Sequence, residues 1–125
     1  MIENEITEII IGSCIKIHKI TGPGLLESAY EEMLCYELSK QGLSFQRQEI
    51  IPIIYDTIKI DSGFRADLII QQKVIVELKS VEKLLPIHSM QLLTYLKLTD
   101  IELGLLINFN VGLLKEGIKR IVNKF

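Results

Sequence analysis

The chain has 125 residues and a formal net charge of −2, with 48% hydrophobic and 24% charged residues. This composition is typical of one globular domain and excludes a disordered chain. No run approaches the roughly 18 apolar residues of a membrane-spanning helix, so no membrane partner is expected. The acidic start lacks the basic residues of a signal peptide. Cys14 and Cys35 lack metal-ligand spacing, so we expect buried free thiols and a cytoplasmic location.

Two helices are expected at the start of the chain. Apolar residues recur at helical intervals over 2–20, and the Thr-Gly-Pro-Gly run over 21–24 ends that helix. A second helix is expected over 25–40, closed by Gly42 as its C-terminal glycine. The apolar positions of this second helix, which are expected to face the core, are Leu26, Tyr30, Met33, Leu34 and Leu38.

The middle of the chain is rich in β-branched residues and predicts strands. The first runs over 45–55, and Pro52 within it indicates an edge strand or a bulge. After a turn at Asp56 and Thr57, a short continuation over 58–60 is expected. A separate hairpin is then predicted, with strands over 63–70 and 74–80.

The last third of the chain predicts a helix, a strand and a second helix. The helix is expected over 87–98 after Pro86, and the strand over 102–108 is apolar enough to be buried on both faces. A short last helix is expected to begin after 111–114 and to end near Lys124. Helices alternating with strands predict an α/β fold, with a central mixed sheet of four or five strands flanked by helices, in a single domain over 1–125.

The central hairpin carries the most informative polar residues. If Gln71, Gln72 and Lys73 form its loop, Ile70 pairs with Val74. The same register places Asp67 opposite Glu77 and Arg65 opposite Lys79. These four side chains then share one face, because side chains alternate along a strand, and the other face is apolar. A shift of the register by one residue would mix the apolar set with charged residues, so we favour this loop.

Two opposed carboxylates about 5 Å apart normally destabilise a hairpin, and a cation between them removes the repulsion. Mg²⁺ and Mn²⁺ prefer such hard oxygen ligands, together with water and phosphate oxygens. The alternative is a solvated strand face on which Arg65 and Lys79 neutralise the two acids. Spacing alone leaves both interpretations open.

Two helical motifs also carry polar groups at spacings that place them on one side of a helix. Glu27 and Tyr30 are three residues apart, and Gln91 and Tyr95 are four apart. Gln91 and Tyr95 are suited to holding a phosphate backbone through neutral hydrogen bonds. Each motif also has an ordinary structural explanation, in helix capping or in core packing. His18 has no partner that spacing identifies.

These residues together resemble a known family. Gly24, Glu27 and Tyr30 within GPGLLESAYEEML are similar to the signature of the GxxExxY proteins. The order Glu27, Asp67, Glu77-x-Lys79 and Gln91-x-x-x-Tyr95 resembles the PD-(D/E)XK nuclease superfamily, in particular its RecB/Cas4-like branch. The resemblance covers about residues 6 to 120. One departure is Ala66, where the superfamily usually has a proline.

The resemblance implies a restriction-endonuclease-like core and a role for each matched residue. Asp67, Glu77 and the carbonyl of Leu78 would hold Mg²⁺ or Mn²⁺, and Glu27 would complete the metal shell or bind a second ion. Lys79 would orient the attacking water and stabilise developing negative charge. The groups implied to contact substrate are Gln91, Tyr95, Tyr30, Arg65 and His18.

The leading functional hypothesis is a metal-dependent phosphodiesterase acting on DNA. The principal alternative is a catalytically silent nuclease-fold module that binds a protein partner or nucleic acid. A metal-dependent hydrolase of a small phosphorylated compound is a third possibility, since a nucleic-acid binder is expected to be more basic than this chain. A homodimer stays open. Sequence does not separate DNA from RNA as substrate, or an exonuclease from an endonuclease.

Overall fold

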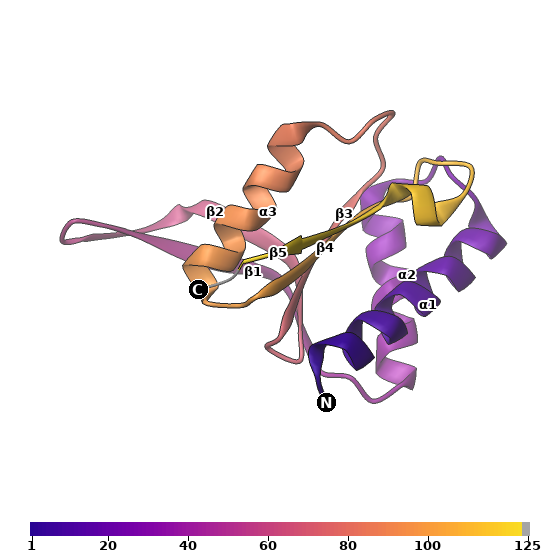
Figure 1. Cartoon of the computed structure of the whole chain (residues 1–125), viewed down its shortest axis with the longest axis horizontal. Coiled ribbons are helices and arrows are strands. Elements are labelled where there is room, and N and C mark those ends of the chain that lie inside the picture. Colours follow the sequence, from indigo (N-terminus) through magenta and orange to yellow (C-terminus); the bar gives the residue numbers. More distant parts are fainter. Residues whose placement is uncertain (124–125) are drawn as a thin grey trace.

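The computed structural model describes residues 1–123. Two helices precede three consecutive strands, and a third helix leads to two final strands separated by a short 3₁₀ helix (Figure 1). The elements are α1 (Glu3–Thr21), α2 (Glu27–Lys40), β1 (Phe45–Tyr55), β2 (Ile58–Ile70), β3 (Val74–Lys79), α3 (Pro86–Thr99), β4 (Leu103–Asn108), η1 (Leu114–Gly117) and β5 (Ile118–Val122).

The strands form one five-stranded sheet in the order β1-β2-β3-β4-β5. β3 and β4 run parallel, while the other neighbouring pairs are antiparallel. A parallel pair requires a crossover connection, and α3 provides it. The predicted α/β fold with a central mixed sheet flanked by helices is therefore confirmed.

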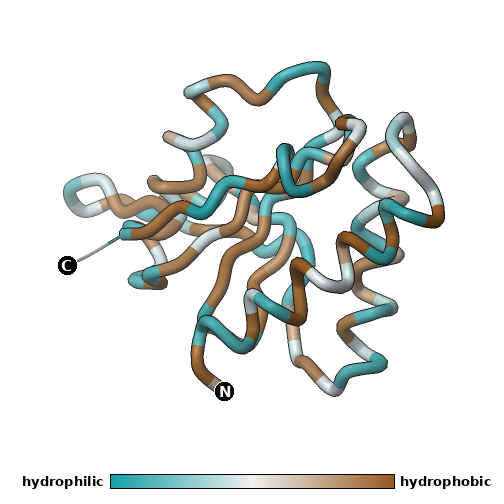
Figure 2. The backbone as a smooth tube through the Cα atoms, turned by 45° about the vertical axis from the view of Figure 1, so that its right-hand side comes forward, coloured by the Kyte–Doolittle hydropathy of each residue, from teal (hydrophilic) through white to brown (hydrophobic). Residues whose placement is uncertain are grey.

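Helices cover both faces of the sheet and create two cores (Figure 1). The α1/α2 core contains Leu68, Val76 and Leu105 from the strands, and the α3 core contains Ile69, Ile75 and Leu106. All six residues of β4 are buried, as predicted for a strand between two helical layers. Figure 2 shows the apolar stretches of chain concentrated in the central strands.

The N-terminal helices lie close to their predicted ranges. α2 begins at Glu27, two residues later than predicted, so Leu26 precedes the helix and is 78% exposed. The prediction that Leu26 packs against the core is wrong, because the Gly-Pro-Gly turn delays the first helical residue. Gly42 has a φ of 75°, the left-handed conformation expected of a glycine that ends a helix.

β1 and β2 form a long hairpin whose distal end projects away from the helices (Figure 1). β2 runs without interruption from Ile58 to Ile70, so the two separate strands predicted there are one. The pairing register shifts between Ile51 and Ile53, which confirms the irregularity predicted at Pro52. We call residues 52–62 the β1–β2 arm.

The predicted C-terminal helix is wrong. The chain makes only the 3₁₀ helix η1 and then the strand β5, which pairs antiparallel with β4 from Ile107–Ile118 to Leu103–Val122. Gly117 makes this possible, because a Cβ there would lie 2.2 Å from the carbonyl oxygen of Asn108. β-Branched residues after Gly117 favour the strand. Lys124, where the helix was expected to end, lies outside the described residues.

In residues 1–123 the structure has no helix with the length and apolar character needed to span a membrane. Cys14 and Cys35 are buried free thiols, as predicted. Burial raises the pKa of Cys35 to about 11 and raises the pKa of Cys14 still more. Both thiols are therefore protonated and unreactive at neutral pH.

Candidate active site where strands β2 and β3 separate

The candidate site forms where the ladder between β2 and β3 stops. The hairpin has the predicted register, with Ile70 opposite Val74, and the ladder ends at the pair Leu68–Val76. The backbones then part, while β3 continues its parallel pairing with β4 as far as Lys79. Backbone groups beside the split therefore need other hydrogen-bond partners.

Two carboxylates supply those partners. The backbone N–H of Asp67 donates to Oε2 of Glu77 at 2.7 Å, and the backbone N–H of Leu78 donates to Oδ2 of Asp67 at 2.9 Å. Each acid thus bridges to the opposite strand in place of a ladder bond. The split thereby brings Asp67 and Glu77 side by side; we call them the acidic pair.

Burial makes the acidic pair electrostatically unfavourable when both groups are ionised. Glu77 is only 6% exposed, and burial, followed by the charge of Asp67, raises its pKa to about 8. Burial likewise raises the pKa of Asp67, against the hydrogen bond from Leu78 that lowers it. At neutral pH this arrangement favours either a proton or a cation between the two acids.

Lys79 is the positive charge next to the acidic pair. It ends β3, is half-buried, and lowers the pKa of both Asp67 and Glu77. Within residues 1–123 it forms no salt bridge with a carboxylate. Its ammonium group is therefore close enough to act on both acids without being tied to either.

Glu27 approaches the same site from the start of α2. Its Oε2 accepts a hydrogen bond from the backbone N–H of Ser80 at 3.1 Å, and its charge contributes to the raised pKa of Glu77. Among the described residues, however, no three His, Cys, Asp or Glu side chains are grouped as metal ligands. The structure therefore places Glu27 beside the acidic pair but not in a three-carboxylate cluster with it.

Helix α3 closes the site from the other face of the sheet. Tyr95 is 7% exposed and packs edge-on against Phe64, with ring centroids 5.1 Å apart. Burial and the charges of Glu77 and Asp67 raise the pKa of Tyr95. Gln91 lies one turn earlier on the same helix and is exposed. Helix α3 thus contributes a phenol close to the acidic pair and an accessible amide.

A family model described as the PD-(D/E)XK nuclease superfamily matches residues 4–121. The chain belongs to this superfamily. No curated protein and no solved structure matches it. Membership supports a nuclease-type function, and PD-(D/E)XK nucleases generally use divalent metal ions. Such an ion fits the hard oxygen donors present here, which are the half-buried carboxylate of Asp67, the buried carboxylate of Glu77 and the nearby carbonyl of Leu78.

Not every residue predicted from the superfamily resemblance reaches this site. Tyr30 is fully buried; its hydroxyl donates to the carbonyl of Gly22 at 2.6 Å and accepts from the N–H of Leu25 at 3.2 Å. Its ring stacks on Phe109 with centroids 4.1 Å apart. In this structure Tyr30 is therefore a clamp on the Gly-Pro-Gly turn, and its predicted substrate contact stays a prediction.

His18 is also structural. Its Nε2 lies 3.2 Å from the carbonyl oxygen of Phe109 and 2.9 Å from that of Val111, so this nitrogen donates to both. The side chain is 8% exposed and fastens the chain that follows β4 to α1. These contacts do not support the substrate-binding role predicted for His18 in this member of the superfamily.

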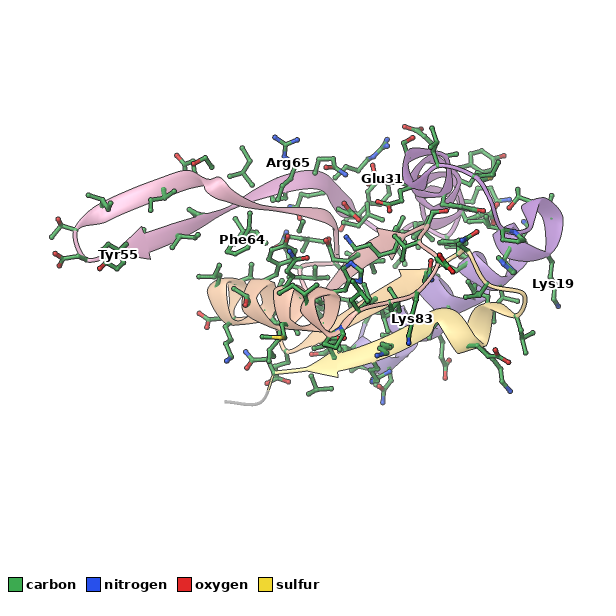
Figure 3. The ribbon with its side chains drawn as sticks, turned by 90° about the horizontal axis from the view of Figure 1, so that it is seen from above. Lys19, Glu31, Tyr55, Phe64, Arg65 and Lys83 are labelled. Carbon is green, nitrogen blue, oxygen red and sulfur yellow. The ribbon has the colours of Figure 1, made fainter. Side chains whose placement is uncertain are left out.

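Arg65 is displaced by a rotation of β2. Ala66 packs in the α3 core and Leu68 in the α1/α2 core, although residues two apart on a regular strand share a face. The strand therefore turns over at Asp67. Arg65 pairs with Ile50 of β1 beyond the end of the β2–β3 ladder, and Figure 3 shows it on the opposite side of the ribbon from Phe64. The prediction that Arg65 faces Lys79 is wrong.

The sequence analysis missed a set of residues beside Asp67. Gln48 of β1 donates from Nε2 to Oε1 of Glu31 at 2.7 Å and to Oδ1 of Asp67 at 3.3 Å. Glu31 is 7% exposed and pairs with Arg47 at 2.9 Å. Glu31 was detectable in principle, because it follows Glu27 by one helical turn. The position of Gln48 depends on strand pairing and has no local signal.

Proposed function

We propose that this protein is a metal-dependent phosphodiesterase that cleaves DNA, and that it belongs with the GxxExxY proteins in the RecB/Cas4-like branch of its superfamily. The observation that carries the proposal is the acidic pair. A half-buried carboxylate, Asp67, and a buried one, Glu77, lie together where β2 and β3 part. A lysine free of salt bridges within residues 1–123, Lys79, lies beside them. Such an arrangement destabilises a protein that has no use for a cation.

Three groups would hold Mg²⁺ or Mn²⁺ in this proposal: the carboxylates of Asp67 and Glu77 and the carbonyl of Leu78. When bound, the ion lowers the pKa of water and offsets the charge of the phosphate oxygens. Glu27 is exposed and one hydrogen bond away from the end of β3, at Ser80. In this proposal Glu27 would complete the metal shell or bind a second ion, as the superfamily resemblance implies.

Lys79 would orient the attacking water and stabilise the negative charge that develops on the phosphate. An ammonium group that already acts on two carboxylates suits this electrostatic role better than removal of a proton. Because β3 is paired with β4 up to Lys79, the lysine backbone is held in place. Preorganisation of this kind avoids rearrangement during the reaction.

Helix α3 would contact the nucleic acid strand next to the metal. Gln91 is exposed and able to donate to or accept from a phosphate or a base edge. Tyr95 is buried except for a small fraction, so its hydroxyl would act close to the acidic pair and not along the strand. Gln91 is therefore the proposed substrate contact, and Tyr95 the proposed link between helix and site.

A binding module is the second candidate function, and the β1–β2 arm favours it. Ile54, Tyr55 and Ile58 in the arm are each more than half exposed. An apolar projection of this kind suits a protein partner better than the phosphate backbone of DNA. An enzyme that requires a partner would combine both functions.

The test is cleavage of labelled single-stranded and double-stranded DNA in Mg²⁺ or Mn²⁺, with Lys79→Ala and a control lysine variant. We expect cleavage by the wild type and a loss of at least about 100-fold in Lys79→Ala. Lys97→Ala, which changes an exposed lysine in the last turn of α3, should cleave as the wild type does. Equal cleavage by a folded Lys79→Ala protein would contradict the proposal. Absence of both cleavage and Mn²⁺ binding would favour the binding module.

A further inference from the structure

Gln48 occupies an unusual place in β1. Its neighbours Arg47 and Glu49 pair with Leu68 and Ala66, so Gln48 lies opposite Asp67, where β2 turns over. Its φ is 50°, in the left-handed region that residues other than glycine rarely adopt. Such a strained backbone persists only where surrounding contacts hold it. The hydrogen bonds of the Gln48 side chain to Glu31 and Asp67 are contacts of this kind.

The amide of Gln48 connects two acids. Its Nε2 lies 2.7 Å from Oε1 of Glu31 and 3.3 Å from Oδ1 of Asp67. An amide nitrogen has two hydrogens, so it can donate one to each carboxylate. The amide oxygen cannot replace it, because it has no hydrogen to donate. Both neighbours thus fix the same orientation of the amide.

Glu31 is a firm anchor for this amide. Its Oε2 accepts from Nε and Nη2 of Arg47 at 3.2 and 2.9 Å, and Arg47 also binds Glu32 at 2.6 Å. Glu31 is buried on α2, whereas Gln48 lies at the surface. Through Glu31, helix α2 therefore holds an exposed side chain against Asp67.

We propose that Gln48, anchored by Glu31, is a positioning residue that fixes the Asp67 carboxylate for metal binding. Asp67 would otherwise be held through Oδ2 alone, by the backbone N–H of Leu78. A hydrogen bond at Oδ1 in addition fixes the plane of the carboxylate and so the direction of its lone pairs. This inference rests on the proposed function, since it assumes that Asp67 is a metal ligand. Second contacts of this type commonly change metal affinity by about tenfold or more.

Two substitutions separate the side chain of Gln48 from its strained backbone. Gln48→Met keeps the length of the side chain and removes the donor. Gln48→Gly removes the side chain and suits the positive φ, so the metal-free protein should melt no lower than the wild type. A residue with only a structural role would leave Mn²⁺ affinity unchanged in Gln48→Gly. If Gln48 is a positioning residue, Gln48→Gly binds Mn²⁺ more weakly even though its stability is unchanged or higher.

The experiment is a titration of Mn²⁺ into each protein, in which electron paramagnetic resonance measures the concentration of the free ion. Thermal melting of the metal-free proteins measures their stability. We expect Mn²⁺ to bind both Gln48 variants about tenfold more weakly than the wild type, at the lower end of the range for such contacts because Gln48 is exposed. Gln46→Met is the matched control, since Gln46 is exposed two residues earlier in β1 and binds Gln72.

The outcomes separate this inference from the proposed function. Wild-type affinity in Gln48→Gly and Gln48→Met would overturn the positioning role while the metal site stands. Equal weakening in Gln46→Met would overturn it as well, because the effect would not be specific to the contact with Asp67. Failure of the wild type to bind Mn²⁺ would instead remove the metal site itself, and the inference with it.

Discussion

Two polar clusters in this molecule both bind backbone groups, but they differ in how their electrostatic requirements are met. His18 and Tyr30, which we call the turn clamp, bind backbone groups on either side of the α1/α2 core. The acidic pair, Asp67 and Glu77, also binds backbone N–H groups. The turn clamp consists of hydrogen-bonding groups with matched backbone partners, whereas the acidic pair adds two like charges.

This difference distinguishes a structural cluster from a candidate functional one. A buried neutral group with a hydrogen-bond partner contributes to stability and needs nothing further. Buried like charges have unmet electrostatic requirements, and their pKa values are raised in consequence. Both clusters contain residues of the superfamily resemblance, so motif membership alone does not separate them.

The largest expected effect is loss of activity from the acidic pair. Asp67→Asn removes one hard ligand, so Mn²⁺ affinity should fall at least about tenfold and DNA cleavage by about a thousandfold. The fold should survive, because an amide oxygen still accepts the hydrogen bond from Leu78. Calorimetric titration of Mn²⁺ and a cleavage assay provide the measurements. Unchanged Mn²⁺ affinity would show that Asp67 is not a ligand.

The second effect is a pH dependence of stability in metal-free protein. The pKa of Glu77 is about 8 in the folded state against 4.5 for an ordinary glutamate, so the folded state holds this proton more tightly. Stability due to Glu77 is therefore greatest below about pH 4.5 and declines as the pH rises to about 8. We expect a decline on the order of a few kcal/mol.

Urea unfolding in a chelator at several pH values measures this decline. Glu77→Gln is the control, because it has no proton to lose. The difference in free energy of unfolding between the two proteins should change across this range of pH and become constant above it. A difference that is independent of pH would mean that Glu77 has an ordinary pKa.

The third effect belongs to the turn clamp. Tyr30→Phe leaves the carbonyl of Gly22 and the N–H of Leu25 without their partner, which should cost about 1–3 kcal/mol of stability. Cleavage per folded molecule should stay close to that of the wild type, since Tyr30 is fully buried. Denaturant unfolding and assays well below the melting temperature separate the two quantities. A large loss of turnover at unchanged stability would return Tyr30 to the catalytic site.

The fourth effect is a pH dependence of metal binding. Glu77 must lose its proton to bind a cation, so Mn²⁺ affinity should rise by at most about tenfold per pH unit and level off above about pH 8. Calorimetry in buffers of different ionisation enthalpy would also detect the released proton. If Mn²⁺ affinity does not change between pH 6 and 8, Glu77 is not a ligand that must first lose a proton.

Several predictions from the sequence succeeded because they depend on local signals. The loop over 71–73 and the alternation of apolar residues around it set the pairing of Ile70 with Val74. The glycine at 42 and the proline at 86 marked helix ends. Other predictions failed because distant contacts decide them. Gly117 must approach the carbonyl of Asn108, and that contact favours the strand β5 over a final helix.

The sequence by itself determined the alternation of helices and strands as far as β4, the hairpin register and the proximity of Asp67 to Glu77. These follow from apolar spacing and turn residues within short segments of chain. Only the tertiary structure decided that β2 turns over at Asp67, so that Arg65 leaves the site and Gln48 enters it. The reason is that α3 packs against Ala66 while α1 and α2 pack against Leu68, and no local pattern records which helix covers which residue.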